Sequence, residues 1–365
     1  MKNVKIAGYV ILMLCLAAPF ITMAQFSETR EMVKSFSLLN DTQIEIANKY
    51  GKIDIKTWEK DSARFEISIR VEEKKLSKLE ESIRNIEFDI TNSEHYLIFR
   101  TEVEKNKSGL AKEFQRFKET LLSSDGNIQV DYTVWIPDSN RLKIENKFGD
   151  IFVGDYKGEV QIDLSNGNLK ANDFTQRLDL ILNFADATIN TINTGRLDCN
   201  FSELYVKEAG SVRVLSKSTE FDFQEVGDIN VDSRRDKFRI RKADLVDAQG
   251  SFSSFRISEL TDRVNIRAEY GDLEIENIAN DFGGIIIQSK NTDVSLYFDR
   301  NTQFNYDFTY SRTEMSLSSQ MEKETEDVSE DEKTMIEKGY FGEKSEETSK
   351  LNITADSGSI SIRTR

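Results

Sequence analysis

The sequence is poor in the side chains that carry most catalytic and metal chemistry. Its 365 residues include one histidine and two cysteines. The one histidine, His95, lies outside the repeating part of the chain, which excludes histidine-based triads within that part and multi-histidine metal sites altogether. The chain also lacks a Walker loop, a G-x-G-x-x-G motif and a C-x-x-C motif. Cys199 alternates with the apolar Leu197, so we expect it to be an inert core thiol. We therefore predict no enzyme activity, no cofactor and no bound metal.

Basic residues are outnumbered by acidic ones, and the formal net charge is −15 at pH 7. Residues 1–24 are typical of a secretory signal peptide, with Lys2 and Lys5 before an apolar stretch over Val10–Leu16. Removing these two lysines would change the charge from −15 to −17. Such a charge argues against nucleic acid and anionic membranes as partners. We expect an exported protein of the periplasm or cell surface, with no membrane span after signal removal. The alternative, a membrane anchor, is less favoured because the apolar run is short.

A short unit with apolar residues at alternate positions around a turn recurs along most of the chain. The turn residues, here called anchors, are Gly51, Gly149, Gly167, Ala185, Ser202, Thr219, Asp236, Ser253, Gly271, Thr292, Thr313 and Gly358. After Gly149 they recur every 17 to 21 residues, except for a last step of 45. The residues two and four after each anchor are apolar without exception, which is the period of a strand. A fixed period of this length predicts a solenoid.

A second strand precedes each anchor, and small residues stand three positions before several anchors, where two strands would meet at an inside corner. One such unit cannot bury its own apolar face, but stacked units can. Stacking would place Phe221, Phe238 and Phe255 in an internal aromatic ladder. Because parallel crossovers are overwhelmingly right-handed, we predict an all-β fold, a right-handed parallel β-solenoid (β-helix).

Composition divides the chain into five predicted regions. They are a signal peptide (1–24), an α/β N-terminal capping region (25–141), a β-solenoid of 17–21-residue rungs (142–318), an acidic mobile insertion (319–350) and a terminal rung (351–365). Helical spacing of apolar residues predicts amphipathic helices over 76–86 and 110–121 in the capping region. The acidic insertion is nearly free of apolar residues, which favours a mobile loop or a marginal helix.

Five residues are candidate surface contacts. Tyr205, Arg239 and Arg256 stand three positions after an anchor and should face outward, and Tyr340 and Phe341 could form a partner-binding arm in the acidic insertion. The alternative for all five is ordinary solvated surface.

The position directly after the anchor is mostly acidic, from Asp150 to Glu314. Stacked acids repel one another, and a calcium ion would relieve the repulsion. Water and neighbouring basic residues are the simpler alternative.

Two segments carry the motif N-K-[FY]-G, namely 48–55 (NKYGKIDI) and 146–153 (NKFGDIFV), with an echo at 269–275 (EYGDLEI). Together with the signal peptide, these units resemble the bacterial "putative adhesin" family, a domain of unknown function with a repetitive β-fold. The resemblance implies an envelope or surface location and transfers no catalytic residues.

We therefore expect a non-catalytic exported module that acts as an adhesin-like binding or envelope scaffold for an unknown protein or glycan of the cell envelope. Two alternatives stay open. One is a carbohydrate-active β-helix enzyme on acidic polysaccharide, and the other is a periplasmic regulatory partner protein.

Overall fold

The computed structural model describes residues 25–103, 128–329, 333–343 and 349–365. The expected signal peptide and the helix expected over 110–121 lie outside these residues. One helix is described, α2 (Leu76–Arg84). The strands towards the N-terminus are β1 (Phe26–Ser37), β2 (Gln43–Lys49), β3 (Ile53–Thr57), β4 (Ser62–Glu73), β5 (Ile86–Asn92), β6 (Tyr96–Val103), β7 (Ile128–Ile136), β8 (Leu142–Lys147), β9 (Ile151–Val153) and β10 (Val160–Ser165). The remaining strands are β11 (Asn168–Asn183), β12 (Asp186–Asn200), β13 (Glu203–Lys217), β14 (Glu220–Arg234), β15 (Lys237–Ser251), β16 (Ser254–Glu269), β17 (Asp272–Ile278), β18 (Gly284–Phe298), β19 (Phe304–Ser316), β20 (Met321–Val328), β21 (Met335–Phe341) and β22 (Ser349–Thr364).

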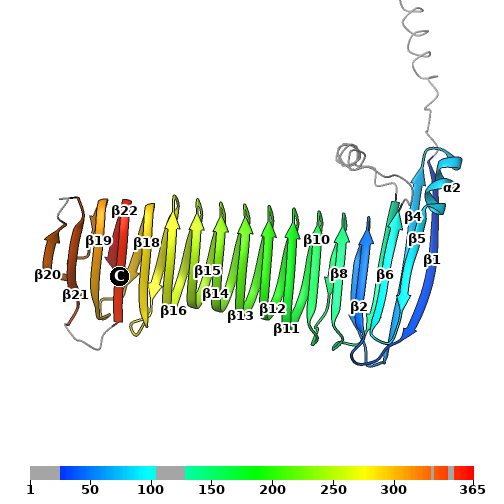
Figure 1. Ribbon diagram of the computed structural model, residues 1–365, viewed down its shortest axis with the longest axis horizontal. Coiled ribbons are helices and arrows are strands. Elements are labelled where there is room, and N and C mark those ends of the chain that lie inside the picture. Colours follow the sequence, from blue (N-terminus) through cyan, green and yellow to red (C-terminus); the bar gives the residue numbers. More distant parts are fainter. Residues whose placement is uncertain (1–24, 104–127, 330–332, 344–348) are drawn as a thin grey trace, which may run out of the picture.

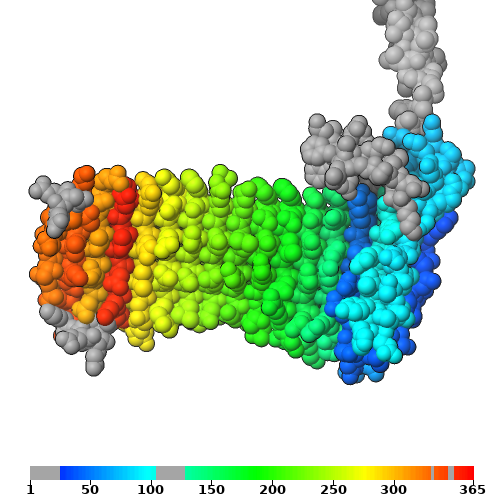
Figure 2. Space-filling view, in the orientation of Figure 1, coloured from blue at the N-terminus to red at the C-terminus, as the bar shows by residue number. Residues whose placement is uncertain are grey.

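The strands stack side by side into one elongated body (Figures 1 and 2). From β10 to β16 each strand pairs in parallel with the strand one repeat later. The pairing is in register, so that Leu204 aligns with Phe221 and Phe221 aligns with Phe238. This confirms the predicted parallel stack of repeats.

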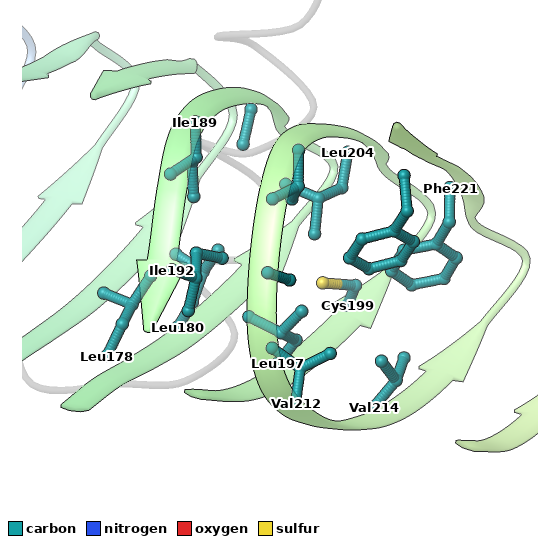
Figure 3. Packing of buried hydrophobic residues seen from close by; sticks show 14 of the residues in the cluster. Leu178, Leu180, Ile189, Ile192, Leu197, Cys199, Leu204, Val212, Val214 and Phe221 are labelled. Carbon is teal, nitrogen blue, oxygen red and sulfur yellow. The ribbon is translucent and has the colours of Figure 1, made fainter. Parts of the chain in front are cut away.

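The apolar columns of the repeat line the interior of the stack. Phe238 lies between Phe221 and Phe255, with ring centroids 4.6 and 5.0 Å apart and nearly parallel planes. The predicted aromatic ladder is therefore confirmed. Cys199 is fully buried in the same interior as Leu197 and Phe221 (Figure 3). Burial raises the pKa of its thiol, which keeps the sulfur protonated and agrees with the expected core thiol.

Every repeat turns at the residue just before the anchor, which adopts a left-handed conformation with φ between 48° and 67°. These residues are Tyr50, Phe148, Asn166, Phe184, Phe201, Ser218, Arg235, Phe252, Tyr270, Asn291, Arg312 and Ser357. Successive corners lie close together, and a Cβ on Gly149 would come 1.9 Å from the carbonyl oxygen of Gly51. Glycine is therefore required at this anchor by the approach of two backbones.

The asparagines of the N-K-[FY]-G motif hold neighbouring corners together. The side-chain amide of Asn48 donates to the carbonyl of Val130 (2.7 Å), and that of Asn146 donates to the carbonyl of Gly51 (2.9 Å). Both asparagines are buried. The motif is therefore explained by the architecture: asparagine links two turns, the aromatic residue forms the corner and glycine admits the close approach.

At the N-terminal end the order of rungs in space differs from their order in sequence. β6 pairs in parallel with β2, and β7 pairs in parallel with β3, so β6 and β7 form a rung outside the one made by β2 and β3. The parallel stack thus extends into the region predicted as a cap. Antiparallel strands adjoin this end, because β4 pairs with β7, β1 with β4 and β5 with β6. The predicted helix over 76–86 is found as α2, which buries Leu79 and Ile83.

At the C-terminal end the last rung in sequence is not the last in space, which corrects the predicted terminal rung. β22 lies between β18 and β19 and pairs in parallel with both. In Figure 2 it forms a red band between yellow and orange neighbours. The 45-residue step therefore reflects a chain that passes outward through β19, β20 and β21 and then returns inward.

The acidic segment 319–350 is largely strand where it is described, not the expected loop or marginal helix. β21 pairs antiparallel with β19, and β20 pairs antiparallel with β21. Side-chain contacts join these strands to the rest of the stack. Phe341 stacks on Phe304 with ring centroids 4.9 Å apart. The buried Glu337 accepts a hydrogen bond from the Tyr306 hydroxyl (3.2 Å) and pairs with Lys323 (3.1 Å). The composition did not predict these strands, because few of the described residues of the segment are apolar and buried.

Candidate ligand-binding groove

A groove of about 950 Å³ runs along the outer surface of the stack. It crosses strands β11 to β16, β18 and β22, and each strand contributes side chains to its lining. Because these strands are in register, equivalent residues lie about 4.8 Å apart along the groove. The floor is therefore a ladder of outward side chains that repeats once per turn.

One outward column, six positions before the anchor, gives the groove its polar character. From β12 to β16 it consists of Arg196, Arg213, Asn230, Asp247 and Asn265, each aligned with the next in the strand register. All five line the groove. The charge changes along the column, from two arginines to an amide–carboxylate–amide run.

Ion pairing differs among the groove arginines. Arg177 pairs with Asp179 at 2.9 Å, and Arg263 pairs with Asp262 at 3.3 Å. Arg196 and Arg213 are both exposed, and neither forms an ion pair with any residue of the described ranges. Asp179 on β11 is the register partner of Arg196 but pairs with Arg177, so this stretch of the groove carries two arginines that have no ion-pair partner among the described residues.

The next stretch of the groove carries one carboxylate between two amides and is rich in hydrogen-bonding groups. Asp247 accepts hydrogen bonds from the side-chain amides of Asn230 (3.3 Å) and Asn265 (3.2 Å), one on each neighbouring strand. Each of these amides keeps a carbonyl oxygen and a second N–H bond. The three side chains can therefore both donate to and accept from a hydroxylated ligand.

The predicted contacts Tyr205, Arg239 and Arg256 lie in one outward column, as their spacing implied, but not in the groove. Arg239 pairs with Glu220 and, at 3.6 Å, with Asp222. Arg256 pairs with Glu274 at 2.9 Å. Both arginines are thus neutralised by neighbouring strands, which supports the surface alternative for this column.

The two other predicted contacts lie together in β21, outside the groove. Tyr340 is half-buried, and Phe341 is fully buried against Phe304. The expectation that Phe341 forms an exposed contact is wrong, because its ring fills the end of the core.

The acidic column next to the anchors makes hydrogen bonds between turns. Asp150 accepts from the backbone N–H and the side-chain amide of Asn168, both at 2.9 Å. Asp293 accepts from the backbone N–H (3.1 Å) and hydroxyl (2.7 Å) of Ser359. Within the described ranges no three potential ligand side chains converge as a metal site would require.

Asp236 is a buried carboxylate at an inside corner. It accepts hydrogen bonds from the Ser216 hydroxyl (2.7 Å), the Thr219 N–H (2.7 Å) and the Arg234 N–H (3.0 Å). The equivalent oxygen one turn later belongs to Ser253, which accepts from the Asp236 N–H (3.2 Å). Burial outweighs these bonds and raises the pKa of Asp236.

This raised pKa predicts a pH-dependent contribution to stability. Folded protein holds the Asp236 proton more tightly than the unfolded chain does, so the contribution is full below the unfolded pKa and is lost as pH rises through the folded pKa. In Asp236→Ser, a hydroxyl replaces the carboxyl as it does at Ser253. At each pH the quantity to compare is the melting temperature of the variant minus that of the natural protein. We expect this difference to be larger at about pH 7 than at about pH 4. The opposite trend would contradict the assignment.

Comparisons with known proteins add little to what the structure itself shows. No protein-family model matches the chain, and no curated protein matches it. A solved structure described as a "putative cell adhesion protein" from Clostridium sporogenes is similar over 93% of this chain and 100% of that one, with 11% identity and a TM-score of 0.19. At that score the likeness carries no argument about fold or function. Among the described residues no helix has the length and hydrophobicity needed to cross a bilayer.

Proposed function

We propose that this protein is a non-catalytic, exported binding module, adhesin-like in character, that holds an extended ligand along its groove. The observation that carries the proposal is the continuity of the groove across strands from β11 to β22. A surface that repeats once per turn matches a ligand that is itself long and repetitive. The resemblance of the N-K-[FY]-G motifs to the "putative adhesin" family is the reason for describing the proposed role as adhesin-like.

Export and the right-handed sense of the coil belong to this proposal. Export is supported by the character of residues 1–24, and the handedness by the preference of parallel crossovers. The absence of turnover also belongs to the proposal, and the contacts of one of the two carboxylates that line the groove support it. Asp247 is engaged by two asparagine amides, whereas a general acid or base needs a carboxyl free to exchange a proton with the ligand.

The test is a binding assay against a panel of neutral and acidic envelope polysaccharides, with released reducing ends measured in the same samples. We expect binding without product. Ser211→Trp places a bulky ring in the groove and should abolish binding. Thr188→Trp adds the same ring to an exposed strand position outside the groove and should leave binding intact.

Two results would count against the proposal. Product release would favour the carbohydrate-active enzyme. Equal binding by both tryptophan variants would place the ligand elsewhere on the molecule.

A further inference from the structure

We propose that the ligand of the groove is an acidic polysaccharide and that Arg196 and Arg213 hold its anionic groups. This inference rests on the proposed function and names the ligand class. It starts from two arginines on adjacent strands, β12 and β13, whose backbones are directly in register. Their Cα atoms are therefore separated by one strand spacing, about 4.8 Å.

Two like charges directly opposite each other on neighbouring strands are unfavourable unless something neutralises them. Elsewhere on the stack the chain supplies that partner itself, as Glu220 does for Arg239 and Glu274 does for Arg256. No described residue forms an ion pair with Arg196 or Arg213: Asp179, which is in register with Arg196, pairs with Arg177 instead. A bound anion is the missing partner, because guanidinium groups hold carboxylates through paired, charge-assisted hydrogen bonds.

The continuation of the groove favours a polysaccharide over other anionic polymers. Beyond the arginines the column runs through Asn230, Asp247 and Asn265, which suit hydroxyl groups. The groove also crosses the strands, whose backbone groups are already paired within the stack, so a peptide cannot join the sheet there. An acidic polysaccharide supplies both anionic groups and hydroxyl groups along one chain.

The experiment compares polygalacturonate with the same polymer after full methyl esterification, using isothermal titration calorimetry at an ionic strength of about 0.15 M, where charges more than about 8 Å apart are largely screened. We expect the acidic polymer to bind and the ester to bind much more weakly. The double substitution Arg196→Gln/Arg213→Gln should weaken binding of the acidic polymer about tenfold or more, as expected for lost hydrogen bonds to charged groups. Its melting temperature should not fall, because the change removes repulsion between neighbouring strands.

A charge-matched control is available on an overlapping pair of adjacent strands. Lys217 and Arg234 are also exposed register neighbours, on β13 and β14, but they lie outside the groove. Lys217→Gln/Arg234→Gln removes the same charge and should leave the affinity within about twofold, because remote surface charges act weakly.

Each alternative outcome overturns a different part of the account. Equal weakening by both double variants, or equal binding of single-stranded DNA, would mean that the groove attracts polyanions without selecting a glycan. Equal binding of the acid and its ester would overturn the anionic inference while leaving the proposed binding function in place. Failure of every polysaccharide to bind would overturn both.

Discussion

Phe238→Ala is expected to lower the free energy of unfolding by about 3–5 kcal/mol, the usual loss when a buried phenylalanine becomes alanine. The side chain is 1% exposed and stacks between Phe221 and Phe255. Because each turn of a solenoid contacts only its neighbours, the cavity weakens two interfaces at once. Urea unfolding followed by circular dichroism measures the loss.

The corner phenylalanine Phe184 provides the matched control for that substitution. Its ring stacks on Phe201 at 5.0 Å but is 61% exposed, at a left-handed corner outside the core. Phe184→Ala should therefore cost only about 0.5–1.5 kcal/mol, the range for an aromatic pair. Similar losses for the two variants would contradict the assignment of Phe238 to the interior.

Removal of β22 is expected to release the whole C-terminal end of the stack. In a chain ending at residue 348, β18 and β19 each lose the partner between them. The buried side chains of Ile353 and Ile360 are lost as well. The unpaired N–H and C=O groups of two inner strands would then face solvent. Hydrogen exchange should therefore lose protection in β19 and β21 and at the β18 amides that bond to β22, while β12 to β15 keep theirs.

The control truncation removes only residues 363–365, which leaves Ile353 and Ile360 in place. It should preserve protection in β18 and β19. If deletion of the whole strand also left their protection unchanged, β22 would not lie between them.

The repeat columns predicted the stack because buried and exposed positions alternate strictly, and only a coil with parallel neighbours buries both columns. They could not predict the order of the rungs. Leu351 and Ile353 fit beside β18, beside β19 or beyond both, since every turn presents the same apolar column. The choice depends on how the chain returns through β20 and β21, whose few core residues and buried Glu337 leave little trace in composition.

The groove was missed for a related reason. The sequence search followed outward residues after the anchor, where Tyr205, Arg239 and Arg256 stand, and their arginines turn out to be paired. Arg196 and Arg213 stand six positions before the anchor, in a column that the same period defines. Their alignment could have been read from the repeat. The absence of an ion-pair partner for these two arginines could not have been read from the repeat, because it depends on side-chain geometry.

The alignment of outward residues one repeat apart is the claim on which the groove and the binding proposals depend. Disulfide formation between Thr188→Cys and Tyr205→Cys tests it most directly, because these positions are register partners on β12 and β13. One strand spacing of about 4.8 Å lies within the Cα separation that a disulfide bridges. We predict rapid oxidation of this pair and none for Thr188→Cys with Asp222→Cys, two turns apart. The reverse pattern, or no bond in either variant, would contradict the in-register stack.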